Sequence, residues 1–270
     1  MTTLSATLEG IGFWCNGLPS WQAARDYARG GALPEAAPAK PSPQLLPPNE
    51  RRRAPDTVAV ALEVALAACA DAGRDPKTLP SVFASTHGEL AITDYMAATL
   101  AADPRSISPT RFHNSVHNAA AGYWTIGAGC MAPTTAITAL DASFAEGLME
   151  ALAQLAAGEE AVLLAAYDSA AGGPLKTMWD SRGLLGGALV LSNAARAGAL
   201  TLRATLGAGE APVSAGPLMR MAADNAMAPM LPLFDALAAV EDQLDAAHTP
   251  GSAILRAGPG RVLRVEWANA

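Results

Sequence analysis

Apolar positions along the chain fall into two patterns. Residues 82–85 predict a short buried strand, and residues 161–166 are a continuous apolar run, which is typical of a parallel strand covered on both faces. Residues 56–72 and 142–157 repeat Ala, Leu, Val or Met at intervals of three and four, and each stretch stops at a glycine. Strands that alternate with helices in this way predict an α/β layered domain.

The N-terminal segment predicts a strand at 5–14 and a short helix at 20–29. Residues 32–55 follow, and their prolines exclude a helix or a central strand, so this stretch must lie on the surface. The Arg51–Arg53 run near its end is interpreted as a solvated or helix-start feature, or else as a contact with a partner subunit. Asp56 is expected to cap the next helix.

Later elements are expected from the same signals. Asn114 can cap a helix that runs through Ile126. Residues 187–192 and 199–206 predict a hairpin around the turn-forming segment 193–198.

The pattern changes after about residue 208. Residues 219–247 favour helix, with a break near Pro229 and Pro232, and residues 252–267 predict a hairpin around Gly258-Pro-Gly260. We therefore expect a main domain over residues 1–207 and a smaller part, residues 208–270, that packs on the same sheet.

Candidate chemistry centres on the junction between a short strand at 135–139 and the helix at 142–157, where Asp141 stands. The first turn of a helix exposes unpaired N–H groups and the positive end of the helix dipole. A cysteine there would be ionised and reactive. An aspartate is a stabilised anion or an N-cap in the same place.

The motifs around this junction resemble the β-ketoacyl synthase family in order and spacing. The resemblance covers roughly residues 5–205 and implies a thiolase-like α/β fold, in which the N-terminal ketosynthase half is complete and the C-terminal half is reduced to a helix plus a closing hairpin. It is carried by Leu8-Glu-Gly-Ile-Gly12, Ser108-Pro109, Asn118-Ala-Ala-Ala-Gly122, Thr125-Ile126, Ala132-Pro133, Asp141-Ala-Ser143, Asp180-Ser-Arg-Gly183 and Gly186-Gly-Ala-Leu-Val-Leu191.

This chain departs from the family where catalysis is concerned. Asp141 occupies the family's cysteine position, so no thioester can form there. The family's two histidines lie in His-Gly-Thr-Gly-Thr and Asn-Ser-Phe-Gly-Phe-Gly-Gly contexts, which surround none of the four histidines here, His87, His113, His117 and His248.

The chain is therefore most similar to the family's chain-length factor, in particular the short form of aryl polyene (xanthomonadin-like) pigment pathways. The resemblance implies a non-catalytic subunit of a heterodimer. Its catalytic β-ketoacyl synthase partner carries the cysteine and histidines and binds the acyl carrier protein.

The resemblance also implies roles for particular residues. Thr110, Arg111 and Phe112 align with the segment that enters the partner's acyl tunnel and sets its depth. His113 and His117 fall in the stretch that crosses the dimer interface. Two further residues keep two interpretations each: His87 lines the tunnel or packs in its loop, and Trp124 belongs to the core or to the interface.

The composition argues against some classes of binding partner and cofactor. With 18 Lys+Arg against 25 Asp+Glu, the net charge of −7 argues against nucleic acid, and it would repel an acidic carrier protein. Cys15, Cys69 and Cys130 have no metal spacing and suit buried thiols of a cytosolic protein. His113 and His117 have i, i+4 spacing, but no third ligand is near, so neither a metal nor another cofactor is expected. Neither a signal peptide nor an apolar run of about 20 residues is found, so we expect a cytoplasmic protein without a membrane span.

Two other functions remain compatible with the sequence. One is a solo thiolase-fold acyltransferase or hydrolase that uses Asp141 or a histidine. The other is a homodimeric scaffold or binding protein without an acyl substrate.

Overall fold

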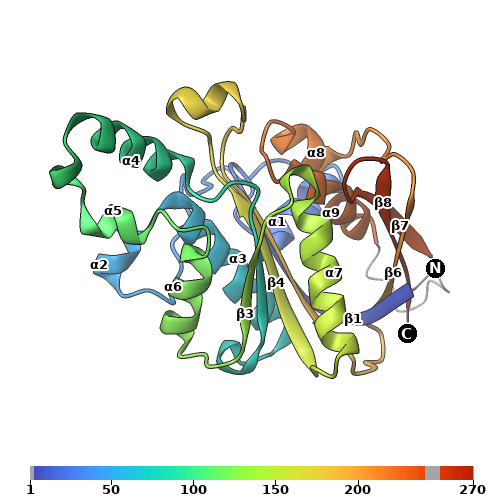
Figure 1. Cartoon of the computed structure of the whole chain (residues 1–270). Coiled ribbons are helices and arrows are strands. Elements are labelled where there is room, and N and C mark those ends of the chain that lie inside the picture. Colours follow the sequence, from blue (N-terminus) through green and yellow to red (C-terminus); the bar gives the residue numbers. More distant parts are fainter. Residues whose placement is uncertain (1–2, 241–249, 270) are drawn as a thin grey trace.

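A mixed β-sheet runs through the whole molecule. The computed structural model describes residues 3–240 and 250–269, and within them one eight-stranded sheet has the order β3-β2-β4-β5-β1-β6-β8-β7 (Figure 1). The strands are β1 (Thr3–Cys15), β2 (Ser81–Ala84), β3 (Thr134–Ile137), β4 (Ala161–Asp168), β5 (Leu185–Ser192), β6 (Leu200–Ala208), β7 (Gly251–Arg256) and β8 (Arg261–Asn269).

Strands β3, β2 and β4 are mutually parallel, and every other neighbouring pair is antiparallel. The α-helices are α1 (Trp21–Ala28), α2 (Pro48–Arg51), α3 (Asp56–Ala72), α4 (Leu90–Ala102), α5 (Pro109–His113), α6 (Ala119–Ala128), α7 (Ser143–Ala156), α8 (Pro217–Ala222) and α9 (Leu231–Ala238). Short 3₁₀ turns are η1 (Pro76–Thr78), η2 (Pro104–Ser106), η3 (Leu140–Ala142), η4 (Gly173–Thr177) and η5 (Ala228–Met230).

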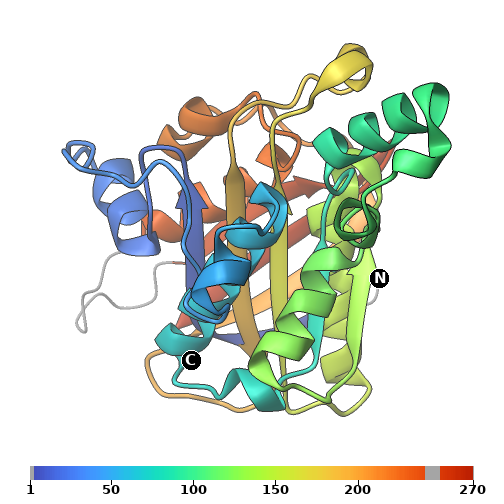
Figure 2. The same ribbon diagram turned by 90° about the vertical axis from the view of Figure 1, so that its left-hand side faces the viewer.

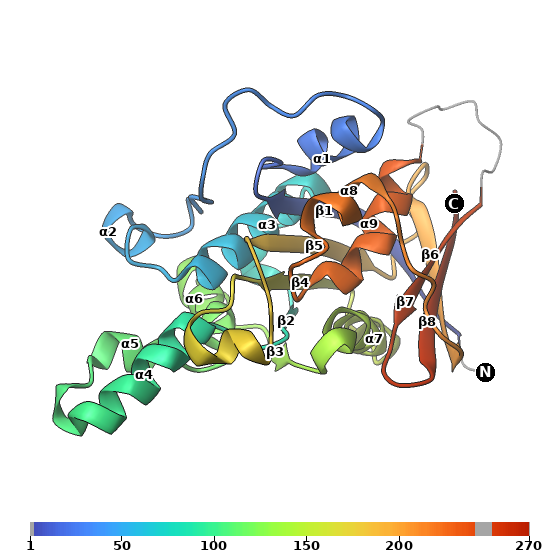
Figure 3. The same cartoon turned by 90° about the horizontal axis from the view of Figure 1, so that it is seen from above.

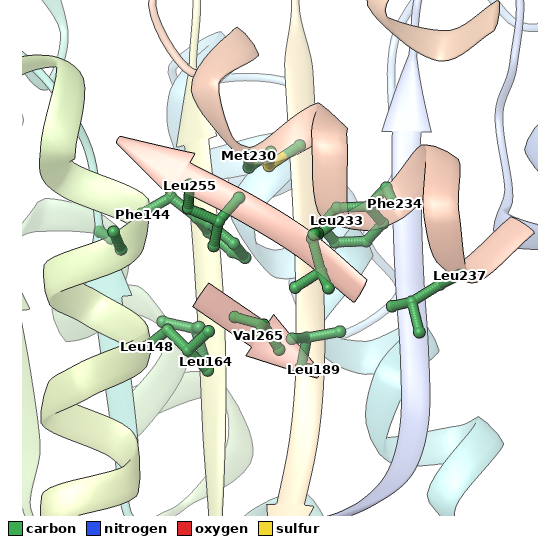
Figure 4. Packing of buried hydrophobic residues seen from close by; sticks show 14 of the residues in the cluster. Phe144, Leu148, Leu164, Leu189, Met230, Leu233, Phe234, Leu237, Leu255 and Val265 are labelled. Atoms are coloured by element: carbon green, nitrogen blue, oxygen red, sulfur yellow. The ribbon is translucent and has the colours of Figure 1, made fainter. Parts of the chain in front are cut away.

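Two apolar cores lie on opposite faces of the sheet. Helices α3 and α6 cover one face, as Figure 2 shows. On the other face, α7 and α9 lie between the central strands and the β6–β8–β7 part of the sheet, which bends over them (Figure 3). Figure 4 shows Leu148 of α7, Leu164 and Leu189 of the central strands, Phe234 of α9 and Val265 of β8 packed in this second core.

The 13-residue strand β1 links the two parts of the sheet. Residues 3–8 pair with β6 and residues 10–15 with β5, with a register shift between Leu8 and Gly10. The hairpin expected between residues 187–192 and 199–206 is therefore wrong, because β1 lies between β5 and β6. Local turn signals could not reveal a strand inserted from the start of the chain.

Helix limits agree with the sequence for the long helices and differ at two caps. Gly73 ends α3 with φ 67°, a left-handed conformation that glycine adopts without strain. Asp56 is the first residue of α3 rather than its cap, which is Pro55. Asn114 does not start a helix either: Ser108 caps α5, Asn114 ends it, and α6 begins only at Ala119.

The proline-rich stretch and the C-terminal part largely follow expectation. Residues 32–55 are mostly exposed, although α2 forms one helical turn with a proline at its start, where proline is tolerated. The expected helix after residue 219 is broken into α8, η5 and α9, and the β7–β8 hairpin is confirmed. The remaining part of that expected helix and His248 lie outside the described residues. Within the described part of the chain, no helix is long and apolar enough to cross a membrane.

Candidate functional site

The turn between β3 and α7 is a strained elbow. Leu140, in η3, has φ 55°, which is unusual for a residue with a side chain. Ser143 holds this conformation, because its Oγ accepts a hydrogen bond from Ala139 N at 2.9 Å and donates one to Leu140 O at 2.6 Å. The elbow thus presents the next side chain, Asp141, at the end of the sheet.

Asp141 is paired with a cation. Its Oδ2 lies 2.5 Å from an Nη of Arg256, at the end of β7, and the two side chains are 46% and 50% exposed. The N-cap interpretation is wrong, because α7 starts after Ala142 and has no side-chain cap. The carboxylate charge is balanced by an arginine 115 residues away instead of by helix N–H groups.

A cleft of about 440 Å³ opens above this pair. Most of its wall is apolar, and Asp141, Arg256, Thr86 and Asn225 supply polar groups. The other lining residues are Trp179, Ala211, Pro212, Val213, Ser214, Met219, Ala223, Ala226, Ala228, Pro229, Pro232 and Ile254. We call it the elbow cleft.

A buried polar cluster lies beneath the elbow, where the parallel strands β2 and β4 end. Asp168 accepts hydrogen bonds from Ser85 Oγ at 2.6 Å and from Thr86 N at 3.0 Å. Thr86 Oγ1 donates to Leu140 O at 3.4 Å, and Thr138 Oγ1 donates to Thr86 O at 2.8 Å. The cluster therefore connects the sheet directly to the elbow.

His87 belongs to this cluster. Its Nδ1 lies 2.9 Å from Gly88 O and 3.6 Å from Asp168 Oδ1. Burial raises the pKa of Asp168, while His87 and the hydrogen bonds from Ser85 and Thr86 act in the opposite direction. The Nε2 atom of His87 is buried and has no hydrogen-bond partner among the described residues.

The spacing of His113 and His117 does not place them on one helical face. Helix α5 ends at His113, and His117 lies in the following turn, where its Nε2 is 2.9 Å from Ser85 O. His113 instead packs edge-on against Tyr123. No group of three or more His, Cys, Asp or Glu side chains that could hold a metal occurs within residues 3–240 and 250–269.

A second cleft, of about 480 Å³, lies between α2, α5 and α6. It contains Thr110 and His113, and we call it the α5–α6 cleft. Its other lining residues are Leu46, Glu50, Arg53, Val116, Asn118, Ala119, Gly122, Tyr123, Ile126 and Gly127. The Arg111 guanidinium instead lies 3.9 Å from the centre of the Tyr95 ring on α4, in a cation–π contact.

Large apolar side chains are exposed on this side of the molecule. They come from α5, α6, the turn after each of these helices, and η3, beside the edge strand β3: Phe112 at 61%, Val116 at 48%, Ile126 at 80%, Met131 at 94% and Leu140 at 55%. We call them the β3-side surface. Trp124 is not part of it, because it is fully buried against Phe83 in the core.

The residues singled out from the sequence therefore do not form one site. Thr110, Phe112 and His113 lie on or beside the β3-side surface, and Arg111 and Trp124 pack against Tyr95 and Phe83. His117 contacts Ser85 O, His87 lies beside Asp168, and Asp141 stands at the elbow, paired with Arg256. Neither Asp168 nor Arg256 was identified from the sequence as a candidate site residue. A carboxylate directly after the buried run 161–167 could have indicated Asp168, whereas nothing in the sequence places Arg256 beside Asp141.

Comparisons with known proteins agree with this architecture. The sequence model of the family described as Beta-ketoacyl synthase, N-terminal domain, matches residues 21–231. No curated protein matches the sequence.

Solved structures share the fold over nearly the whole chain. The ketosynthase ApeO in complex with its chain length factor ApeC from Xenorhabdus doucetiae matches at TM-score 0.72 and 21% identity, over 97% of this chain and 99% of that chain. The ishigamide ketosynthase/chain length factor matches at 0.69 and 17% identity, over 98% and 99%. A complex of a type II polyketide synthase acyl carrier protein with its ketosynthase, AntDE:AntF, matches at 0.74 and 10% identity, over 100% of both chains.

Proposed function

The chain belongs to the β-ketoacyl synthase N-terminal domain family, and we propose that it is a chain-length-factor subunit without a catalytic centre of its own. In this proposal it pairs with a catalytic β-ketoacyl synthase, shapes that partner's acyl tunnel and receives the acyl carrier protein only indirectly. The product would be a polyketide- or fatty-acid-like chain of the aryl polyene type.

The observation that carries the proposal is the elbow itself. Its strained backbone and its support by Ser143 are present, but the side chain it displays is an aspartate paired with Arg256. A carboxylate held by a guanidinium is a weak nucleophile, and covalent acyl catalysis needs an activated one with a base nearby. The geometry of a nucleophile position thus remains without the nucleophile.

The β3-side surface supports a partner at this edge. Strand β3 is an edge strand, and an unpaired edge can accept a strand from another chain. Pro133 O and Ile137 O accept hydrogen bonds from Ser81 N and Ser85 N, so these carbonyl groups at the two ends of β3 point towards β2. The N–H and C=O groups of the residues that alternate with them along β3 therefore point away from the sheet. Exposed apolar side chains next to such an edge mark an interaction site.

We also propose that residues 208–270 are a reduced C-terminal half. The outward side of β6 and β8 carries polar residues in cross-strand positions, with Arg203 opposite Glu266 and Thr205 opposite Arg264. A surface of this kind is stable in water, so no further covering layer is required.

Product length from the reconstituted pair tests the function. We expect Phe112→Ala to lengthen the products and Thr110→Trp to shorten them, because overpacking of about 1–3 kcal/mol biases successive lengths by roughly five- to hundredfold. Leu100→Ala, on the exposed side of α4, is the matched control. Mass spectrometry of carrier-bound products that finds the same lengths in all variants, with activity retained, would contradict the proposal.

Turnover measured with the same reconstituted pair, and with the purified chain alone, distinguishes a chain-length factor from a solo enzyme. Asp141→Asn removes the charge and keeps the side-chain shape, so the chain-length-factor proposal expects unchanged turnover by the pair and none by the purified chain alone. A loss of about a hundredfold or more with the pair intact is the effect of removing an acid–base group, and it would favour catalysis by Asp141.

A further inference from the structure

The elbow cleft combines an apolar wall with one polar corner. Trp179, Val213, Met219, Pro232 and Ile254 contribute to the wall, and the corner is the Asp141–Arg256 pair. Its volume of about 440 Å³ lies in the range of sites that hold small organic molecules. The cleft is separate from the α5–α6 cleft, since the two share no lining residue.

The polar corner has unused hydrogen-bonding capacity. Each side chain of the pair is about half exposed, and the contact between them joins Asp141 Oδ2 to a single Nη of Arg256. Within the described residues, Asp141 Oδ1 and the other N–H groups of Arg256 make no further hydrogen bond. A carboxylate acceptor and guanidinium donors therefore stand side by side at the cleft.

Two of the other polar side chains in the cleft, Asn225 and Thr86, are already engaged within the protein, and Ser214 and Trp179 add only neutral groups. Asn225 donates to the carbonyl oxygens of Asp168 and Arg182, and its Oδ1 accepts from Met227 N. Thr86 Oγ1 has two carbonyl oxygens, those of Leu140 and Ala226, within 3.4 Å. The charged groups that a ligand would meet in the cleft are thus those of the Asp141–Arg256 pair.

The charge balance of this pair selects the ligand. A ligand carboxylate would meet Asp141 as a like charge, and a ligand ammonium would meet Arg256 in the same way. A neutral carboxamide offers an N–H to Asp141 and a C=O to Arg256 without adding charge. From this match we propose that the elbow cleft reversibly binds a small neutral carboxamide that carries an apolar chain.

Isothermal titration of the purified chain with three probes of equal length tests this site. Hexanamide is expected to bind at least tenfold more tightly than hexanoate and hexylammonium. Arg256→Leu should weaken hexanamide binding tenfold or more and abolish its preference over hexylammonium, because the repelling cation is gone, while the discrimination against hexanoate remains. Arg203→Leu removes the same charge from an exposed position on β6, outside the cleft, and should leave hexanamide binding unchanged.

A second variant and a second signal keep the test independent of folding. Asp141→Asn retains the shape of the corner and should reduce the discrimination against hexanoate, because the repelling charge is gone. Hexanamide should also change tryptophan fluorescence through Trp179, and this change should disappear in Trp179→Phe, since none of the other four tryptophans, Trp14, Trp21, Trp124 and Trp267, lines the cleft.

Equal binding of all three probes, or binding that Arg256→Leu and Arg203→Leu weaken alike, would overturn the proposal. Absence of hexanamide binding at millimolar concentration would do so as well. Because the isolated chain is used, none of these outcomes bears on whether the chain pairs with a synthase.

Discussion

At the scale of single residues, two ion pairs join charged side chains that are distant in sequence. Asp141 meets Arg256 at the elbow, and Glu9, at the register shift of β1, meets Arg74 beyond the end of α3. Both Glu9 oxygens accept from the Arg74 guanidinium, at 2.7 and 2.9 Å, and Ser192 Oγ donates to one of them at 2.8 Å. The irregular point of β1 is thereby fixed to α3 and to β5.

This network makes stability dependent on pH. The hydrogen bond from Arg74, opposed in part by burial, holds the pKa of Glu9 below its ordinary value of 4.5. A depressed pKa in the folded state stabilises the protein above about pH 4.5, and this contribution is lost as the pH falls through the folded-state pKa. We expect Glu9→Gln to lower the free energy of unfolding by about 1–3 kcal/mol at pH 7, with a smaller difference from the wild type below pH 4.

Urea unfolding at pH 7 and below pH 4 measures both values. Asp180→Asn is the control, because Asp180 forms an exposed pair with Arg182, and it should produce no measurable change at either pH. A constant difference between Glu9→Gln and wild type across this pH range would show that the charge of Glu9 is not the stabilising feature.

At the scale of elements, the contact between β1 and α3 depends on two glycines. A Cβ at Gly10 would lie 2.3 Å from Ala68 O, and one at Gly12 would lie 1.9 Å from Val64 O. These contacts are far inside van der Waals distance, so a larger residue would force the helix away from the strand. The Gly-Ile-Gly pattern, recognised in the sequence as a family feature, is thus explained by packing.

Gly12→Ala is therefore expected to destabilise the chain by about 3 kcal/mol or more, because backbone rather than a movable side chain must shift. Gly122→Ala in α6 is the opposite case, since nothing lies within 4 Å of its added Cβ. It should stabilise the isolated chain by up to about 1 kcal/mol through helix propensity. Denaturant midpoints of the two variants measure this, and similar shifts in both would contradict the packing argument.

At the scale of the whole molecule, the surface around the β3 edge of the sheet and the outward face of β6 and β8 differ in the polarity of their exposed side chains. The β3 side presents a half-exposed edge strand and the exposed apolar side chains around it, whereas the outward face of β6 and β8 is polar. Helix α6 packs beside β3, so Ile126 and Met131 stand next to the free edge. In the proposed heterodimer, this asymmetry favours assembly on the β3 side.

Ile126→Glu should prevent co-purification with the synthase partner and leave the stability of the isolated chain unchanged, because the side chain is 80% exposed. Met178→Glu makes a similar change at a 75% exposed site beyond η4 and should have no effect on pairing. Pull-down followed by size exclusion measures the complex. Undiminished pairing of Ile126→Glu would place the interface elsewhere.

The sequence by itself determined the local elements and the family. Periodicity gave the long helices α3 and α7, the apolar strand β4 and the β7–β8 hairpin, because each depends on neighbours within a few residues. The order of motifs around Asp141 indicated the β-ketoacyl synthase family, since a strand, a tight turn and a helix are encoded in one continuous segment.

Features that depend on contacts between distant segments were decided only by the tertiary structure. Strand β1 lies between β5 and β6 because pairing energy rather than chain adjacency sets strand order. The separation of His113 from His117 follows from the early end of α5. The pairing of Asp141 with Arg256 could not be predicted from the sequence. Strand β7 reaches the elbow because the sheet bends around its core, and a bend of this kind depends on packing between distant segments rather than on a local sequence pattern.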